Sequence, residues 1–380
     1  MPGQVAEGEL DNPLLAPTMV VGAIGEFECA LGQYVATTGV LSGEYIVGGF
    51  LLASNIWGRR WRPNILETAG NCGGGYGYYT PLQTARFMAE DGSRRIEAFA
   101  EADVPNKNGL LAQLAAYAGY SNTLLGEGFC EMAIDAGPLE TREQIWARAE
   151  EWFTKAITLA QSANDASIRD MALVGRARVR LDLGKKTEAA ADAEQVPVGY
   201  VRNATHSTTI ARRNNRVYTA NIRDRDISVG PNYRNLTVDG EADSRVRVTF
   251  ANRNGVDGVT PQWDQTKYTA LNSNIPIASW NEAQLIIAEA RGGQAAFDAI
   301  NRLRTRAGLP LLAAGTAVDS TTILEERRRQ LFSEGQRYND MLRHNLPFPS
   351  GVDHKGQLYG DVTCVPLPNV ETLNNPNIRR

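Results

Sequence analysis

The sequence predicts a mostly α-helical protein in which tetratricopeptide-like helical hairpins carry irregular, loop-rich insertions and a little β-structure. Residues 14–197 show apolar side chains every three or four positions, as expected for one buried face of a helix. Pairs of these helices are joined by tight turns, which is the form of a repeat hairpin. Residues 198–280 are instead rich in Asn, Asp, Arg and Gly, with only short alternating runs that favour loops and short strands. Helical periodicity returns in residues 281–380, and we expect one domain over residues 1–380.

The first helices can be placed from their apolar stripes and from the signals at their ends. In "APTMVVGAIGEFECALGQYV" the apolar stripe consists of Val21, Ile24, Phe27, Leu31 and Tyr34. A second helix is expected in "YTPLQTARFMAEDGSRRIEAFA", with Thr80 as N-cap and Gln83 completing a capping box. Thr141 and Gln144 form the same pattern before the helix expected in "IWARAEEWFTKAITLAQSA".

The clearest hairpin lies in "ASIRDMALVGRARVRLDLG" and the following "TEAAADAEQV". Gly184 ends the first helix in the position that favours a left-handed residue, and Pro197 prevents the second helix from continuing. A similar pair is expected near residues 110–161, and a third in "WNEAQLIIAEARGGQAAFDAINRLRTRAGLP", where Gly292 and Gly293 form the turn. Because the hairpins are not contiguous, they predict a helical scaffold with insertions rather than a regular solenoid.

Two later segments have distinct patterns. In the middle of the chain, the alternation in "RVRVTF" predicts a two-stranded ribbon. Near the C-terminus, "ILEERRRQLFSEGQRYNDMLRH" (residues 323–344) predicts one highly charged helix with Gly335 on its buried face, in contact with another backbone. Arg328 falls on the same face, so we expect a carboxylate of a neighbouring helix to pair with it. The apolar part of this face consists of Leu324, Leu331, Tyr338 and Leu342.

Composition argues against several classes of function. The net charge of −4 and the pI of about 5.6 do not suggest a nucleic-acid partner. The sequence contains no run of about 18 apolar residues that would predict a membrane-spanning helix. The start "MPGQVAEGELDNP" lacks the features of a signal peptide, so either the protein is cytosolic or the chain begins after a removed leader. The four cysteines and three histidines do not form a metal-binding pattern, and we expect no metal and no cofactor.

Three ordered motifs near the C-terminus resemble those of the SusD/RagB family of surface nutrient-binding lipoproteins. They are "AEARGGQAAFDAINRLRTRAGLP", "ILEERRRQLFSEGQRYNDMLRH" and "CVPLPNVETLNNPNI". The N-terminal helices and the variable middle insertion are similar to the rest of that family. The resemblance implies an outer-membrane, surface-exposed protein that is tethered by a lipid on an N-terminal Cys. It also implies that the protein covers a SusC-like TonB-dependent transporter and delivers glycans or peptides to it. In this family the charged helix is scaffold, which packs the C-terminal half against the repeats.

The sequence departs from the family pattern at its start, because no lipidated Cys precedes "MPGQV". The anchor is therefore expected outside this chain. The middle insertion is also short, which argues against a large carbohydrate platform. The compartment implied by the resemblance is oxidising, and a disulfide between Cys29 and Cys130, both on N-terminal helices, is the expected pair. Spacing alone does not fix this connectivity.

Aromatic residues beside Asn and Arg predict a shallow ligand surface, because aromatic rings stack on sugar rings and amides bind hydroxyl groups. Such residues occur in two irregular segments, 55–79 and 215–268. The expected ligand-contact residues are Trp57, Trp61, Asn64, Tyr76, Tyr78, Tyr218, Tyr233 and Trp263. The alternative is that Tyr79 and one Trp pack in the core and that the second group caps the core under a long loop. Helical spacing predicts core positions for Trp146, Trp152 and Trp280.

The sequence lacks a complete calcium-binding motif, and it favours one of three functions. Asp239, Glu241 and Asp243 alternate as calcium ligands do, but the other ligands of an EF-hand loop are missing, which favours a surface turn. The favoured function is non-enzymatic binding of glycans or other oligomeric nutrients. One alternative is a tetratricopeptide scaffold for a protein partner, which an apolar or basic repeat groove would favour. Another is a helical hydrolase, which a carboxylate pair in a cleft would favour.

Overall fold

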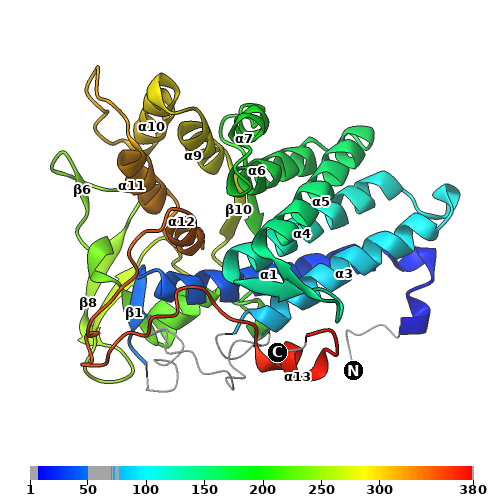
Figure 1. Ribbon diagram of the computed structural model, residues 1–380, viewed down its shortest axis with the longest axis horizontal. Helices are drawn as coiled ribbons and strands as arrows, with labels where there is room; N and C mark the ends of the chain where they lie inside the picture. The colour runs from blue at the N-terminus through cyan, green and yellow to red at the C-terminus, as the bar shows by residue number, and fades with distance from the viewer. Residues whose placement is uncertain (1–6, 50–69, 71, 73–76, 379–380) are drawn as a thin grey trace.

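The structure, a computed structural model, describes residues 7–49, 70, 72 and 77–378 (Figure 1). It is mostly helical, as the sequence predicts. The helices are α1 (Ala16–Leu41), α3 (Tyr79–Ala98), α4 (Lys107–Gly128), α5 (Arg142–Ser162), α6 (Ala166–Asp182), α7 (Lys186–Ala193), α8 (Arg216–Tyr218), α9 (Trp280–Arg291), α10 (Gly293–Ala307), α11 (Ser320–Gln330), α12 (Arg337–Arg343) and α13 (Asn369–Asn374).

Helices α3 to α7 pack one against the next, and α9 and α10 continue this row (Figure 1). The hairpin helices approach closely because small residues lie where they cross. A Cβ atom added at Gly119 of α4 or Gly175 of α6 would lie 2.6 or 2.3 Å from the ring of Phe153 on α5. Both positions therefore accept only glycine without a shift of this buried ring.

Helix α1 runs along the base of this row and packs against α3 and α4 (Figure 1). In the described part of the chain, Pro13–Leu41 is the one helical segment long and apolar enough to cross a membrane. Within the fold it is a core helix that buries polar side chains as well as apolar ones. Glu28 is 3% exposed, and its carboxylate accepts hydrogen bonds from the backbone N–H and the hydroxyl of Thr205 at 2.8 and 3.0 Å.

The strands are short and pair as antiparallel couples. They are β1 (Tyr45–Val47), β2 (Glu131–Ala133), β3 (Leu139–Thr141), β4 (Val201–Ala204), β5 (Ile227–Val229), β6 (Thr237–Val238), β7 (Glu241–Ala242), β8 (Val248–Asn254), β9 (Pro261–Gln265) and β10 (Ile275–Ser279). The couples are β1–β5, β2–β3, β4–β10, β6–β7 and β8–β9. The predicted ribbon is confirmed as β8–β9. Ser228 joins β5 to this ribbon, because its hydroxyl donates to Pro261 O at 2.8 Å and accepts from Trp263 N at 2.8 Å.

Two helix starts were predicted from capping boxes, and one of them is confirmed. Thr141 caps α5, and Gln144 completes the box with both hydrogen bonds present. The prediction for Thr80 is wrong, because α3 already begins at Tyr79. Gln83 instead donates to the hydroxyl of Tyr79 at 3.1 Å and to Ala133 O at 3.0 Å. A tertiary contact with the β2 strand thus replaces the local cap.

The charged stretch 323–344 is not one helix. It forms α11 and α12, with a turn between them in which Gly335 has a φ of +82°. Gly335 is buried as predicted, but it lies against side chains of α1 rather than another backbone. Arg328 pairs with Glu325 of its own helix at 2.7 Å, so the predicted partner on a neighbouring helix is wrong.

Buried ion pairs and hydrogen bonds explain most of the other charges in this stretch. Arg327 of α11, 4% exposed, pairs with Asp340 of α12 at 2.9 Å. Asn339 of α12 donates to Asp182 of α6 at 3.0 Å, so α12 fastens the C-terminal half to the repeats. These contacts agree with the scaffold role that the family resemblance implies for this stretch. The middle segment has a similar pair, in which buried Asp243 binds Arg245 at 2.8 Å.

The disulfide pairing differs from the prediction. Cys29 is bonded to Cys72, and Cys130 is bonded to Cys364, so the predicted Cys29–Cys130 pair is wrong. The second bond joins the end of α4 to the C-terminal tail, where Cys130 N also donates to Val365 O at 3.1 Å. Cys29 lies within α1, whereas Cys130 follows the end of α4 and bonds to Cys364 of the C-terminal tail, a partner that local spacing does not indicate.

Candidate functional site

The predicted residues Trp57, Trp61, Asn64 and Tyr76 lie outside the described residues, and their role stays a prediction. The chain is fixed at described positions before and after most of them. Lys355 donates from its ammonium group to Gly49 O at 2.5 Å, and Cys72 is bonded to Cys29 of α1.

Tyr78, also predicted to contact ligand, is a core residue. It is 2% exposed, and its hydroxyl donates to Gly128 O at 2.9 Å. Its ring centroid lies 5.4 Å from that of Tyr34 and 4.9 Å from that of Phe129. The ring therefore has no face that a ligand can cover, and the prediction for Tyr78 is wrong. Its neighbour Tyr79 packs in the core, as the alternative interpretation holds.

An aromatic pair lies on the outer ribbon of the middle segment, which we call the Trp263 surface. It consists of Phe250 on β8, Trp263 on β9 and Arg234. The rings of Phe250 and Trp263 face each other across the ribbon with centroids 5.2 Å apart. Arg234 places its guanidinium carbon 5.0 Å from the Trp263 ring. Phe250 is 46% exposed, and Trp263 is half-buried, so part of this aromatic pair faces solvent. Tyr218, on α8, is also half-buried and packs against the core.

A cavity of about 650 Å³ borders Tyr233, the residue before Arg234, and we call it the Tyr233 groove. Four segments distant in sequence form it: the turn after α1, the short helix Pro231–Tyr233, helices α11 and α12, and the C-terminal tail. Its lining residues are Ser42, Gly43, Ile46, Pro231, Asn232, Tyr233, Arg328, Arg337, Met341, Pro347, Phe348, Pro349, Ser350 and Tyr359.

Tyr233 itself is buried behind the wall of the groove and exposes little of its side chain to the cavity. The residue is 3% exposed, and its ring stacks on Phe332 with centroids 5.1 Å apart. Arg328 covers the ring from a distance of 4.9 Å and donates to Asn232 O at 3.0 Å. This is the core-capping alternative, so Tyr233 positions the wall of the groove while neighbouring side chains line its space.

The groove combines flat rings with hydrogen-bond donors. Phe348 and Tyr359 contribute aromatic rings, and Arg337 contributes a guanidinium that forms no ion pair within the described part of the chain. None of the described residues that line it is Asp or Glu. Rings and guanidinium groups suit a neutral or negatively charged polar ligand, whereas acid–base chemistry on a sugar needs carboxyl groups.

A buried carboxyl group lies beneath the groove. Glu44 is 1% exposed, and its carboxylate accepts a hydrogen bond from Ser333 N at 3.1 Å. Burial raises the pKa of Glu44 to about 7, against the opposing effects of the Ser333 hydrogen bond and the charge of Arg337. Next to it, the hydroxyl groups of Tyr45 and Ser333 hydrogen-bond. The region under the groove therefore contains a group that titrates near neutral pH.

Comparison with known proteins assigns the family. A sequence model of the SusD family matches residues 163–362, which is more than half of the chain. The chain belongs to the SusD family. No curated protein sequence matches it.

Solved structures support the SusD fold over nearly the whole chain. A SusD-like carbohydrate binding protein from Bacteroides vulgatus is 15% identical, with 97% of each chain covered and a TM-score of 0.71. Surface glycan-binding protein A from Bacteroides uniformis is 14% identical, with 96% of this chain and 98% of that chain covered and a TM-score of 0.68. The protein of that name from Bacteroides thetaiotaomicron, in complex with laminarihexaose, is 14% identical, with 95% and 97% covered and a TM-score of 0.68. At these identities the likeness establishes the fold.

Most of both candidate surfaces lies inside the region matched to the SusD family. The Trp263 surface falls within it entirely, and the groove falls within it except for Ser42, Gly43 and Ile46. Sequence reasoning missed Phe250, although the alternation that predicts the ribbon also places it opposite a strand partner. It had no signal for Arg337 or Phe348, because only the fold brings α12 and the tail to the same cavity.

Proposed function

We propose that this SusD-family protein binds glycans at the cell surface without altering them and delivers them to a TonB-dependent outer-membrane transporter. The observation that carries the proposal is the arrangement of the two surfaces. Tyr233 and Arg234 are consecutive residues, yet Tyr233 borders the groove and Arg234 lies over Trp263. One stretch of backbone thus separates an accessible aromatic pair from a groove lined by rings and guanidinium groups.

This combination suits sugars. The apolar face of a sugar ring stacks on an aromatic ring, and its hydroxyl groups accept hydrogen bonds from guanidinium or amide N–H groups. Phe250 and Trp263 offer stacking surfaces, and Arg337 offers donors in the groove. The laminarihexaose complex of the relative from Bacteroides thetaiotaomicron supports the choice of an oligosaccharide as ligand.

A binding role is favoured over hydrolysis by the composition of the groove. Glycoside hydrolases place two carboxyl groups on either side of the bond that they cleave. The described residues that line the groove include no Asp or Glu, and the nearby Glu44 is buried beneath it. We therefore propose that bound glycan leaves the protein unchanged.

The alternative of a repeat scaffold for a protein partner finds less support. A cavity of about 690 Å³ lies along α5, and its exposed surface is mostly apolar, with two Glu and two Lys residues also in its lining. Glu150 in this lining binds Arg180 at 2.8 Å and Lys185 at 2.6 Å, so its charge is already paired. A protein partner at this cavity therefore stays the alternative function, behind glycan binding at the two aromatic surfaces.

The location at the outer face of the outer membrane is also part of the proposal. Its support is the family and the two disulfides, Cys29–Cys72 and Cys130–Cys364, which are typical of an oxidising compartment. We propose that a lipid on an N-terminal Cys outside this chain provides the anchor.

The test is a glycan and peptide array followed by calorimetry with the best neutral glycan. The variant Phe250→Ala/Trp263→Ala should bind at least tenfold more weakly, because each stacked ring contributes on the order of 1 kcal/mol. Phe87→Ala, which removes a ring that is 52% exposed on α3, is the matched control and should bind like the parent. Peptides bound in preference to glycans, or equal affinity of all three proteins, would contradict the proposal.

A further inference from the structure

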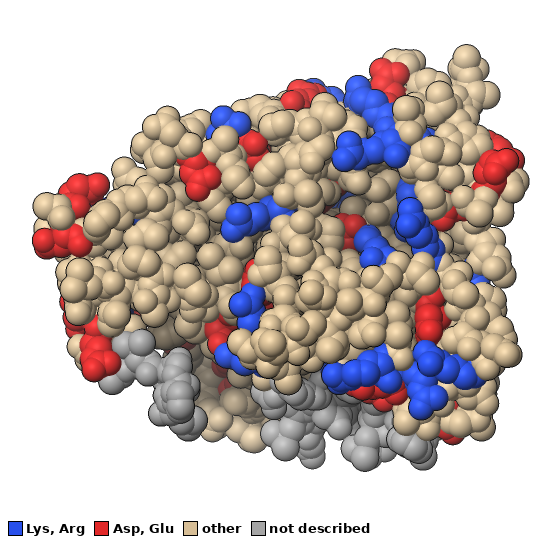
Figure 2. All heavy atoms as spheres, turned by 180° about the vertical axis from the view of Figure 1, so that it is seen from behind, with Lys and Arg blue, Asp and Glu red and all other residues tan. Residues whose placement is uncertain are grey.

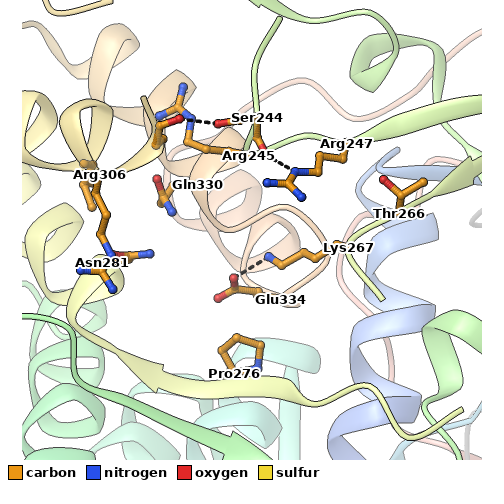
Figure 3. A pocket seen from close by; sticks show the side chains of 12 residues that line it. Ser244, Arg245, Arg247, Thr266, Lys267, Pro276, Asn281, Arg306, Gln330 and Glu334 are labelled. Atoms are coloured by element: carbon orange, nitrogen blue, oxygen red, sulfur yellow. Dashed lines mark hydrogen bonds and ion pairs between the residues drawn. The ribbon is translucent and has the colours of Figure 1, made fainter. Parts of the chain in front are cut away.

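A third cavity, of about 470 Å³, lies between the middle segment and the C-terminal helices (Figure 3). We call it the Arg247 pocket. Its walls come from the segment before β8, the segment after β9, strand β10, and helices α9, α10 and α11. Its volume falls in the range of about 300–1,000 Å³ that is typical of small-molecule sites. Lys and Arg side chains gather on the back face in the half of the molecule that contains these elements (Figure 2).

The pocket is separate from the Tyr233 groove. Arg328 of α11 lines the groove, whereas Gln330 of the same helix lines the pocket. At about 100° per residue these two side chains leave the helix on opposite sides. Helix α11 therefore stands between the two cavities.

Positive charge in the pocket exceeds what its carboxylates neutralise. Lys267 pairs with Glu334 at 2.6 Å, and Arg245 pairs with Asp243 at 2.8 Å. Arg247 and Arg306 form no ion pair within the described residues, and both are exposed. Arg306 lies over the ring of Trp280 at 5.9 Å, and the N–H groups of both guanidinium groups are left for an outside partner.

Their positions suit a ligand held from two sides. Figure 3 shows Arg306 entering the pocket from α10 and Arg247 entering from the side of the middle segment. Arg247 uses its Nε–H to donate to Ser244 O at 3.0 Å, which fixes the side chain and leaves the terminal N–H groups available. The terminal edge of a guanidinium binds a carboxylate or sulfate through two parallel hydrogen bonds.

Two amide side chains in the pocket also lack hydrogen-bond partners among the described residues. Asn281 of α9 and Gln330 of α11 make no side-chain hydrogen bond with described residues, and the Oε1 atom of Gln330 is buried. Buried polar atoms in folded proteins nearly always have a hydrogen-bond partner. An amide offers both donors and an acceptor, so these two residues suit hydroxyl groups beside a charged group. Leu303 and Pro276 supply apolar contact in the same pocket.

We propose that the Arg247 pocket is a second ligand site, which binds an anionic sugar unit of an acidic glycan. Arg247 and Arg306 bind its carboxylate or sulfate, and Asn281 and Gln330 bind its hydroxyl groups. The excess of guanidinium groups favours a negatively charged ligand, and the two amides and the size of the pocket favour a ligand larger than a bare ion. The choice of a sugar rather than another polar anion rests on the proposed glycan-binding function.

The test compares four probes of equal length by calorimetry at low and high salt. They are tetragalacturonic acid, a sulfated galactose tetrasaccharide, neutral galactotetraose and tetraglutamate. The pocket variant is Arg247→Gln/Arg306→Gln. The control is Arg291→Gln/Arg302→Gln, which removes the same charge from exposed positions of α9 and α10 outside the pocket. Thermal melting of each protein checks that it is folded.

We expect at least one acidic tetrasaccharide to bind at least tenfold more tightly than the neutral one at low salt. The difference should shrink at high salt, because these guanidinium groups are exposed. The pocket variant should lose at least tenfold in affinity for the acidic probe, and the control should not. The comparison of the uronate with the sulfate ester identifies which anion the pocket prefers.

Three results would overturn the inference: tetraglutamate binding as well as the acidic sugar, equal affinity for acidic and neutral sugars, or a pocket variant that binds like the parent. If neutral glycans still bind at the Trp263 surface in that case, only this inference fails. If no glycan binds to any part of the protein, the proposed function fails with it.

Discussion

Gly335, in the turn between α11 and α12, lies directly against the ring of Tyr34 on α1. A Cβ atom added at Gly335 would be 3.1 Å from two ring carbons of Tyr34 and 3.1 Å from a methyl group of Val35. Tyr34 is fully buried, and the backbone of Gly335 has a φ of +82°. The turn that splits the charged stretch therefore needs glycine for its conformation and for the space that it leaves to α1.

We expect Gly335→Ala to destabilise the protein more than Gly308→Ala. Gly308 also has a positive φ, of +67°, but its added Cβ would meet nothing within 4 Å. Both changes strain the backbone by about 1 kcal/mol, and only the first also overpacks the core, at a further cost of about 1–3 kcal/mol. Urea denaturation measures both. Equal losses would show that Tyr34 and Val35 move away without cost.

The outcome at this turn shows what periodicity can predict. The positions of Leu331, Gly335 and Tyr338 correctly identify buried residues, because burial follows apolar spacing whether or not the helix continues. The break between α11 and α12 follows from contact with α1, which lies about 300 residues earlier in the chain. Local spacing contains no information about such a contact.

The parts of the candidate site that the sequence predicts are those that depend on local patterns. Trp263 and the ribbon follow from local alternation, so the Trp263 surface was partly predictable. The Tyr233 groove and the Arg247 pocket each join segments that are distant in sequence. Arg247 and Arg306 look like ordinary surface charges in the sequence, and they become a pair only when α10 packs beside the middle segment.

The disulfides give a direct test of the connectivity. Non-reducing peptide mapping should find Cys29 linked to Cys72 and Cys130 linked to Cys364. A peptide that links Cys29 to Cys130 would contradict the structure.

The two bonds should also differ in their effect on stability. In the chain-entropy account a disulfide stabilises more when it closes a longer loop, and the sequence separations are 234 for Cys130–Cys364 and 43 for Cys29–Cys72. Each bond should contribute about 2–4 kcal/mol. We expect Cys130→Ser/Cys364→Ser to lower the midpoint of urea denaturation more than Cys29→Ser/Cys72→Ser. The opposite order would indicate that native contacts at Cys72 matter more than loop length.

The buried carboxyl group of Glu44 should make stability depend on pH. Its pKa is about 7 in the folded protein, raised by burial from the usual 4.5. Between these values the folded state holds the proton more tightly than the unfolded state does, so stability falls as pH rises from 4.5 to 7. Above pH 7 the protein bears the full free-energy cost of an ionised, buried carboxylate, which is about 3 kcal/mol for a pKa shift of this size.

We therefore expect Glu44→Gln to gain stability over the parent at pH 8, and to gain little at pH 4.5. The amide oxygen of Gln can still accept the hydrogen bond from Ser333 N. Urea denaturation at the two pH values measures the difference, and Glu101→Gln, at an exposed position, controls for the loss of one negative charge. If the variant and the parent have the same stability at both pH values, ionisation of Glu44 costs the folded protein little free energy.

The predicted contacts of Trp57 and Trp61 can be tested together with the Trp263 surface. Both residues belong to the aromatic segment 55–79, in which Cys72 is bonded to Cys29 of α1. The repeat hairpins, in contrast, use their apolar stripes for packing between helices. We expect Trp57→Ala and Trp61→Ala each to weaken glycan binding by about 1 kcal/mol or more, since one stacked ring contributes on this order. The parent affinity should itself lie in the micromolar to millimolar range.

The combination of variants decides whether the segment and the ribbon serve one ligand. If Trp57, Trp61 and Trp263 contact the same glycan, the triple Ala variant should lose binding to below detection in calorimetry. In the double variant Trp57→Ala/Trp263→Ala, the loss of binding free energy should differ from the sum of the two single losses, because residues that share a ligand are coupled. If Trp57→Ala and Trp61→Ala stay folded and bind like the parent while Trp263→Ala does not, the ligand lies on the middle segment alone.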